Sequence, residues 1–259
     1  MTPMLQGALG VASGSLVGFS LGLIGGGGSI LAVPLILYIV GVKDPHAAIG
    51  TSAVAVAASA AVNLANHARQ GLVRWHCALV FAAAGVVGAF GGSSLGKIVD
   101  GQKLILLFAL LMMAVGALML RPRSDIGNPL VTLTRSNTPA LIALGFASGA
   151  LAGFFGIGGG FLIVPGLMLA TGMPISNAIC SSLVAVTAFG LTTSANYAFS
   201  GLVDWDIATL FLAGAVFGGL AGAKLSRHLS AKRGALNNVF AAVVFAVAIY
   251  MIYRTYTSM

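Results

Sequence analysis

The chain has 259 residues, of which 58% are hydrophobic and only 7% are charged. A soluble domain carries about 25% charged residues, so this composition excludes an ordinary soluble domain and predicts an integral membrane protein. The 13 Lys and Arg residues outnumber five Asp, with no Glu. They lie in short clusters between long apolar runs, which favours topology signals over a nucleic-acid-binding surface.

The first half begins with an apolar stretch, 5–42, that is interrupted by five residues from Gly25 to Ser29. Three helix-length apolar segments follow, at about 46–68, 74–96 and 102–120. Roughly 20 apolar residues cross a bilayer, so each of the three predicts a spanning helix. The interrupted stretch has about 20 apolar residues before the glycines and only about 13 after them, which is short for a full span.

The second half has the same parts. After a linker at 122–137, the apolar stretch 138–172 is interrupted from Gly156 to Gly160, and helix-length segments follow at about 176–198, 205–226 and 234–253. The sequence therefore predicts an all-α membrane protein with a first repeat at 1–121, this linker, and a second repeat at 138–259.

Matched residues indicate that the two halves are homologous. A shift of 131 pairs Pro34 with Pro165, and a shift of 130 pairs Asn66 with Asn196 and Trp75 with Trp205. The stretch Gly71-Leu72-Val73 recurs as Gly201-Leu202-Val203. Chance matches of Gly or Ala are common in such a protein, but matched Pro, Asn and Trp are not, so we infer an internal duplication.

The positive charges bear on topology. If each interrupted stretch returns to its starting side, each half crosses an odd number of times and the halves are inverted, whereas single crossings make them parallel. The inverted arrangement places nine Lys and Arg on one face against four on the other, and the parallel one six against seven. The positive-inside rule favours inversion, with both termini outside. The nine are Arg69, Arg74, Arg121, Arg123, Arg135, Lys224, Arg227, Lys232 and Arg233, and the four are Lys43, Lys97, Lys103 and Arg254.

The glycine interruptions predict a binding site. Each mid-helix glycine weakens a helix by about 1 kcal/mol relative to Ala, and unpaired backbone survives in a membrane only inside protein or beside a watery cavity. A helix that starts after such a break points free N–H groups and its positive end toward the cavity. Two breaks facing each other predict an anion site near the midplane, although close helix packing is the alternative use of glycine. The candidate residues are Gly25, Gly26, Gly27, Gly28 and Ser29, with Gly156, Gly158, Gly159 and Gly160.

Polar side chains inside the helices extend this candidate site. Thr51 and Ser52 match Ser181 and Ser182 just after each interrupted stretch, and Asn66 matches Asn196 near the end of the same helices. Hydroxyl and amide groups can donate hydrogen bonds to an oxyanion, but they also bridge helices. For the two Asn residues, near a helix end, capping or turn formation is the favoured interpretation.

His67 is the histidine closest to the apolar interior, and it is the candidate for a proton or gating role, with a simple interfacial position as the alternative. All five Asp residues lie at or beyond segment ends. The sequence therefore has no carboxylate inside the membrane that would indicate a proton relay or a divalent-cation site. It also has no group of residues typical of a catalytic site. We expect no enzyme activity, cofactor or metal.

The same residues resemble the sulfite exporter TauE/SafE family, also called the toluene-sulfonate uptake permeases. The resemblance rests on the Gly-rich run from Gly22 through Pro34, its copy from Gly153 through Pro165, and the stretch from Asn66 to Trp75. It implies a multi-pass protein of the bacterial inner membrane that moves sulfite, sulfoacetate or another organosulfonate. Family members differ in substrate and direction. In the second half Cys180 replaces Gly50, and Tyr197 replaces His67.

These observations predict a secondary transporter or facilitator for a small sulfur-containing anion. A transporter of another small solute such as a metal ion, and a non-transporting membrane protein, are the alternatives. The expected partners are the anionic substrate and the lipid bilayer, without nucleic acid and with a homodimer as a possible assembly.

Overall fold

The computed structural model describes residues 3–24, 26–69, 71–120, 128, 131–228 and 233–257. Within these ranges the chain is all-helical, without a strand, and eight helices are long and apolar enough to cross a membrane. Each of the six predicted spanning helices begins within one residue of its predicted start. The eight are α1 (Pro3–Ile24), α3 (Pro45–Ala68), α4 (Trp75–Ile98), α5 (Gly101–Met119), α6 (Thr138–Phe155), α8 (Ile175–Ala198), α9 (Trp205–His228) and α10 (Arg233–Thr257).

Both interrupted stretches consist of a full-length helix followed by a short one. After α1 come a 3-10 turn η1 (Gly26–Leu31), the single turn α2 (Ala32–Pro34) and a π-helical segment η2 (Leu35–Val40). After α6 comes α7 (Gly160–Thr171). The short pieces have too few residues to cross alone, as the sequence predicts.

Small residues set the closest helix contacts. Gly14, Gly18 and Gly22 on α1 lie against the backbone of α9 at Phe211, Ala215 and Gly219. Gly145, Gly149 and Gly153 on α6 meet α4 in the same way at Phe81, Gly85 and Ala89. At these positions a Cβ would collide with the partner backbone, so glycine permits the approach. In each pair of helices the residue numbers of the contacting positions rise together, so α1 is parallel to α9 and α6 is parallel to α4.

The helices α3 and α8 form the middle of the bundle. In each of them 67% of the most apolar segment is buried, compared with 33–44% in the other spanning helices. Gly50 lies against Tyr197, and Gly190 lies against Ala57. The numbering rises on one helix as it falls on the other, so α3 and α8 are antiparallel. The two halves are therefore interlocked, because each of these three helix pairs joins one half to the other.

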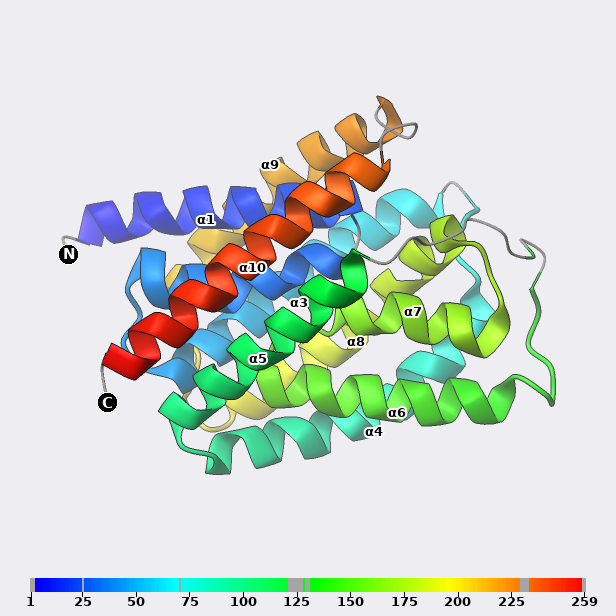
Figure 1. Ribbon diagram of the computed structural model, residues 1–259, viewed down its shortest axis with the longest axis horizontal. Coiled ribbons are helices and arrows are strands. Elements are labelled where there is room, and N and C mark those ends of the chain that lie inside the picture. Colours follow the sequence, from blue (N-terminus) through cyan, green and yellow to red (C-terminus); the bar gives the residue numbers. More distant parts are fainter. Residues whose placement is uncertain are drawn as a thin grey trace.

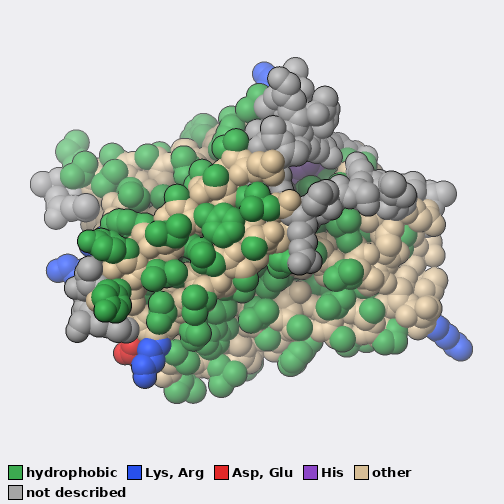
Figure 2. Space-filling model, viewed as in Figure 1, with side chains coloured by type: hydrophobic (Ala, Val, Ile, Leu, Met, Phe, Trp, Pro, Cys, Tyr) green, Lys and Arg blue, Asp and Glu red, His purple; other side chains and the backbone are tan. Residues whose placement is uncertain are grey.

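Figure 1 shows both termini at the same end of the bundle, with α1 running away from that end and α6 running toward it. Hydrophobic side chains cover the middle of the face in Figure 2, while the visible Lys and Arg side chains lie toward its edges. Val87, Phe90, Phe217 and Val239 are among the exposed large hydrophobics. Such a belt suits contact with lipid tails.

Candidate functional site

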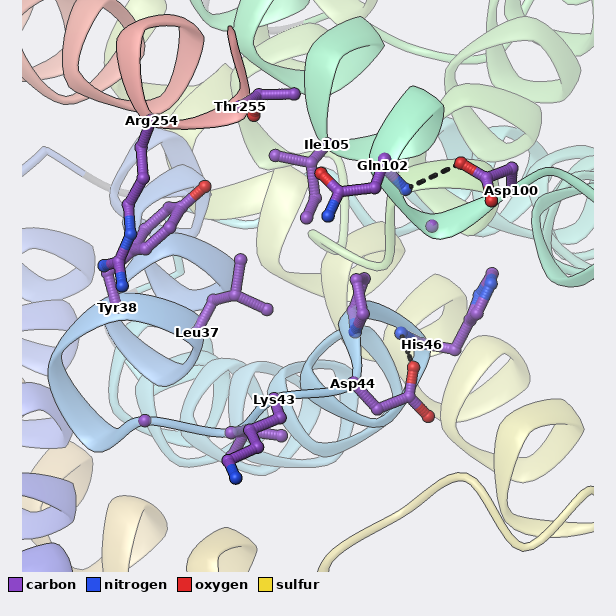
Figure 3. A pocket seen from close by; sticks show the side chains of 14 residues that line it. Leu37, Tyr38, Lys43, Asp44, His46, Asp100, Gln102, Ile105, Arg254 and Thr255 are labelled. Atoms are coloured by element: carbon purple, nitrogen blue, oxygen red, sulfur yellow. Dashed lines mark hydrogen bonds between the residues drawn. The ribbon is translucent and has the colours of Figure 1, made fainter. Parts of the chain in front are cut away.

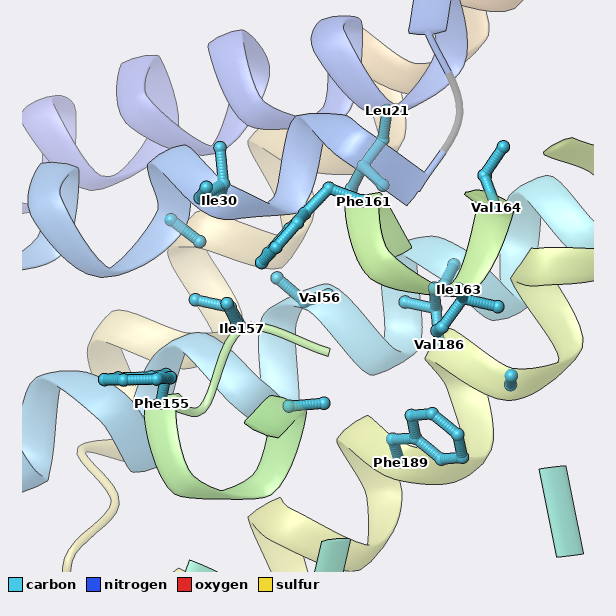
Figure 4. Close-up of a cluster of buried hydrophobic side chains, with 14 of the residues drawn as sticks. Leu21, Ile30, Val56, Phe155, Ile157, Phe161, Ile163, Val164, Val186 and Phe189 are labelled. Atoms are coloured by element: carbon cyan, nitrogen blue, oxygen red, sulfur yellow. The ribbon is translucent and has the colours of Figure 1, made fainter. Parts of the chain in front are cut away.

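The two glycine interruptions lie together in the middle of the bundle. The turn η1 contacts α7 and α8, and Figure 4 shows Ile30 from η1 near Phe161 from α7. Val56 of α3 and Val186 of α8 lie in the same buried cluster with Ile157. The interruptions therefore meet in an apolar centre. Gly25, one of the candidate residues, lies outside the described part of the chain.

The second interruption requires glycine for its backbone conformation. Gly156, Gly158 and Gly159 have φ of 67, 66 and 65°, in the left-handed region that glycine adopts without steric cost. Gly156 ends α6, and Gly159 precedes the first residue of α7, Gly160. The amides of Leu162 and Ile163 donate to the carbonyl of Gly159.

The amides of Gly158 and Gly159 donate no hydrogen bond within the described part of the chain, although both residues are buried. Buried backbone N–H groups are nearly always paired. Here they precede the N-terminus of α7, whose positive end attracts anions. A Cβ on Gly158 would lie 2.9 Å from Val56 Cγ1 and 3.0 Å from Val186 Cγ1, so these two valines pack closely against Gly158.

The first interruption uses glycine for packing as well. A Cβ on Gly28 would collide with the backbone of Ser20 and Leu21 on α1. Its counterpart Gly159 is close to the corresponding helix, where a Cβ would lie 2.6 Å from the Cβ of Ala152. Each interruption thus folds back onto the helix that precedes it. Gly26, Gly27, Ser29 and Gly160 lie in the same turns, and Ser29 is fully buried.

The four hydroxyl candidates are buried and engaged in hydrogen bonds. Thr51 Oγ1 accepts from the amide of Asp204 at 3.0 Å, and its counterpart Ser181 Oγ accepts from the amide of Arg74 at 2.9 Å. These matched bonds tie each core helix to the start of a helix in the other half. Ser182 donates to the carbonyl of Ile179 at 2.8 Å.

Ser52 is the candidate hydroxyl that directly contacts an interruption. It donates to Ile49 O at 2.8 Å and to Gly156 O at 3.2 Å. The structure therefore brings one hydroxyl to the second interruption.

The two Asn candidates lie near the ends of α3 and α8. Asn196 does not cap its helix, because its Nδ2 donates to Ser93 Oγ at 2.6 Å and Ser94 Oγ at 3.0 Å, and its Oδ1 accepts from Lys97 Nζ at 2.8 Å. It therefore bridges α8 to α4. Sequence reasoning treats Lys97 only as a topology charge, and nothing in the linear pattern places it beside Asn196. Asn66 is half-buried.

His67 contacts Cys180, the residue that stands in the second half where the first half has Gly50. Its Nδ1 lies 3.6 Å from Cys180 Sγ across α3 and α8. At the opposite end of the same helix pair, Gly50 lies against Tyr197. The two positions that differ between the halves therefore contact each other at both ends of the helix pair. The larger ring, Tyr197, lies against Gly50, and the smaller ring, His67, lies against Cys180.

Residues 10–251 of the chain match the sulfite exporter TauE/SafE family. A probable membrane transporter protein from Xylella fastidiosa (strain 9a5c) is 53% identical over 96% of both chains. The probable membrane transporter protein YunE of Bacillus subtilis is 28% identical over 86% of this chain and 89% of its own length. A probable membrane transporter protein of Haemophilus influenzae is 29% identical over 92% and 95%. No solved structure shows significant similarity.

The eight apolar helices of the described residues, the two glycine interruptions and a match that covers nearly the whole chain agree with one another. The protein is a multi-pass membrane transporter that belongs to the sulfite exporter TauE/SafE family.

Proposed function

We propose that this transporter is a secondary carrier or facilitator for a small sulfur-containing anion, either sulfite or an organosulfonate such as sulfoacetate, in the bacterial inner membrane. The observation that carries the proposal is the pair of buried amides at Gly158 and Gly159, before the N-terminus of α7, which donate no hydrogen bond within the described residues. An oxyanion is the ligand that such a turn stabilises best.

The proposed path lies between the two interruptions. Val56 and Val186 cover Gly158, so an anion reaches the amides only when these side chains or the short helix α7 move aside. Ser52, already hydrogen-bonded at Gly156, lies where it can exchange its acceptor for the anion. In transporters built from repeats, alternating access is largely a rocking or gating of one repeat against the other around a fixed site.

We further propose that the halves are inverted repeats, with 69–74 and Arg135 on the cytoplasmic side. Support comes from the parallel pairs α1 with α9 and α6 with α4, the antiparallel pair α3 with α8, and the opposite directions of α1 and α6 in Figure 1. An inverted duplication requires that counterpart helices run in opposite directions. The proposed partners are the anion and the bilayer, without nucleic acid. We also propose a homodimer as the assembly, which a mass measurement in detergent can test.

The test is flux in proteoliposomes with labelled sulfite, sulfoacetate, acetate and a divalent metal ion. We expect protein-dependent, saturable flux of the sulfur anions and none of the metal ion. Flux of the metal ion alone would assign the protein to another solute, and absence of all flux would contradict the proposal. Gly91→Ala is the matched control variant, because a Cβ at Gly91 meets nothing within 4 Å.

A further inference from the structure

Tyr197 is a fully buried side chain whose hydroxyl has no hydrogen-bond partner among the described residues. Most buried polar side-chain atoms are paired, and leaving one unpaired costs stability. Phenylalanine would fill the same space without that cost. The hydroxyl therefore departs from what folding alone favours, and such departures are expected at functional sites.

The ring of Tyr197 lies between α3, α4 and the end of α6. A Cβ added at Gly50 of α3 would lie 2.9 Å from Tyr197 Cβ, and one added at Gly96 of α4 would lie 3.3 Å from Tyr197 Oη. The same Cβ at Gly96 would lie 2.7 Å from the carbonyl oxygen of Phe154 on α6. The hydroxyl therefore points toward the end of α6.

This position adjoins the second glycine interruption from two directions. On one side, Phe154 is two residues before Gly156, at which α6 ends. On the other side, Ile49 precedes Gly50 on α3, and a Cβ added at Gly156 would collide with the side chain of Ile49. Tyr197 therefore borders the interruption at the point where α6 ends.

Tyr197 lies near the end of the bundle that bears both termini. A cavity of about 640 Å³ lies at that end, beside the start of α3 (Figure 3). Its lining includes Pro45, the first residue of α3, and Gly50 is about 7.5 Å deeper along the same helix. Water therefore reaches close to the level of Tyr197. The charged residues that line the cavity are two acids, Asp44 and Asp100, and two cations, Lys43 and Arg254. With its charges balanced, the cavity itself does not select an anion.

The hydroxyl of Tyr197 can give a new hydrogen bond at this level. Lys97 Nζ lies 5.9 Å from the centroid of the Tyr197 ring, but it already donates to Asn196 O, Asn196 Oδ1 and Ser200 Oγ. An ammonium group has three donors, so Lys97 has none left for a ligand. Tyr197 Oη has a free O–H, which suits the acceptor oxygens of an oxyanion.

We propose that Tyr197 is a specificity-determining residue, whose hydroxyl donates a hydrogen bond to the oxyanion as it passes between the terminus-bearing end and the second interruption. The substrate class, sulfite and organosulfonates, rests on the proposed function. In the structure the buried ring fills the space between α3, α4 and α6. Passage on this side therefore requires the ring to move, and the moving ring presents its O–H to the anion.

The test compares Tyr197→Phe with the wild type in proteoliposomes and in detergent. Phenylalanine keeps the ring and removes an unpaired polar atom, so the melting temperature should stay unchanged or rise. The KM for sulfite and sulfoacetate flux should rise about ten-fold or more, the effect of losing one hydrogen bond to a charged group. The Kd of purified protein for labelled sulfoacetate should rise by a similar factor. Tyr256→Phe is the matched control, because Tyr256 is 81% exposed, and it should behave as the wild type.

The outcomes separate this proposal from the proposed function. Wild-type KM and wild-type sulfoacetate binding in Tyr197→Phe would overturn the role of the hydroxyl and leave the transport function standing. A lower melting temperature together with those values would assign the hydroxyl to the fold and would also overturn its role. Binding that depends on the Tyr197 hydroxyl without any flux would sustain the role and contradict the transport function. Neither flux nor binding in the wild type would overturn both.

Discussion

Cys180 Sγ lies 3.6 Å from Nδ1 of His67, while their counterparts Gly50 and Tyr197 meet at the other end of the same helix pair. A Cβ on Gly50 would lie 2.9 Å from the Cβ of Tyr197 and would collide with the carbonyl of Leu202. The two differences between the halves, Gly50 against Cys180 and His67 against Tyr197, therefore compensate one another in side-chain volume.

A double-mutant cycle tests this compensation. Gly50→Cys should destabilise the protein by about 1–3 kcal/mol, the cost of overpacking a tight core, measured as the melting temperature in detergent. Adding Tyr197→His rebuilds the Cys–His pairing and should recover part of that loss. Additive effects of the two substitutions would contradict a direct contact between them.

Gly158→Ala should abolish anion flux. The φ of 66° costs an L-residue about 1–2 kcal/mol, and the added methyl would lie within 3.0 Å of Val56 and Val186. The check is initial flux in proteoliposomes beside Gly91→Ala, which should transport normally. Normal flux in Gly158→Ala would return this glycine to a structural role. Gly28→Leu is less informative, because a side chain at Gly28 collides with α1 and should prevent folding.

Asn196→Ala should weaken the α4 to α8 contact. The substitution removes the Oδ1 acceptor of half-buried Lys97 and the donor to Ser93 and Ser94, and such unsatisfied groups cost about 1–3 kcal/mol. We expect a lower melting temperature, with Thr209→Ala on the exposed surface as control. An unchanged melting temperature would show that the network adds no stability.

Cysteine labelling tests the inverted topology. Phe199→Cys, exposed near the end of α8, should react with an impermeant maleimide in intact cells, whereas Ser136→Cys and Arg69→Cys should react only after the cells are opened. The native cysteines are buried, so the wild type gives the background. Labelling of Ser136→Cys and Phe199→Cys from the same side would overturn the arrangement.

The helix framework could be predicted from sequence because each boundary carries a local signal. The apolar runs stop at Arg69, Lys97 and Asp204, and the interruptions contain several glycines, so helix starts and breaks follow from the linear pattern. Matching signals occur in both halves of the sequence. This is why the predicted starts agree with α3 through α10.

Contacts between distant residues could not be predicted in this way. Gly50 with Tyr197, Asn196 with Lys97, and the cavity shared by Lys43 and Arg254 join residues about 100 or more positions apart. The polar residues inside helices make Thr51 and Ser181 candidates for anion binding or helix bridging, and in the structure both accept from backbone amides of the other half. These hydrogen bonds depend on the positions of loops that no local pattern encodes.

The membrane potential alone should drive efflux. An anion that leaves a compartment negative inside gains about 2.3 kcal/mol per charge per 100 mV, and His67→Ala should change the rate without abolishing it. The check is efflux under a potassium–valinomycin potential with no pH or sodium gradient. Strict dependence on a pH gradient would contradict this coupling and would make His67 the proton carrier to examine.

The most direct test of the central claim is the initial rate of labelled sulfite efflux from proteoliposomes, compared with protein-free liposomes and with Gly158→Ala. The proposed function predicts saturable efflux in the wild type, competition by sulfoacetate, and rates at the protein-free level in Gly158→Ala. Wild-type rates no higher than those of protein-free liposomes, for sulfite and for sulfoacetate alike, would contradict it.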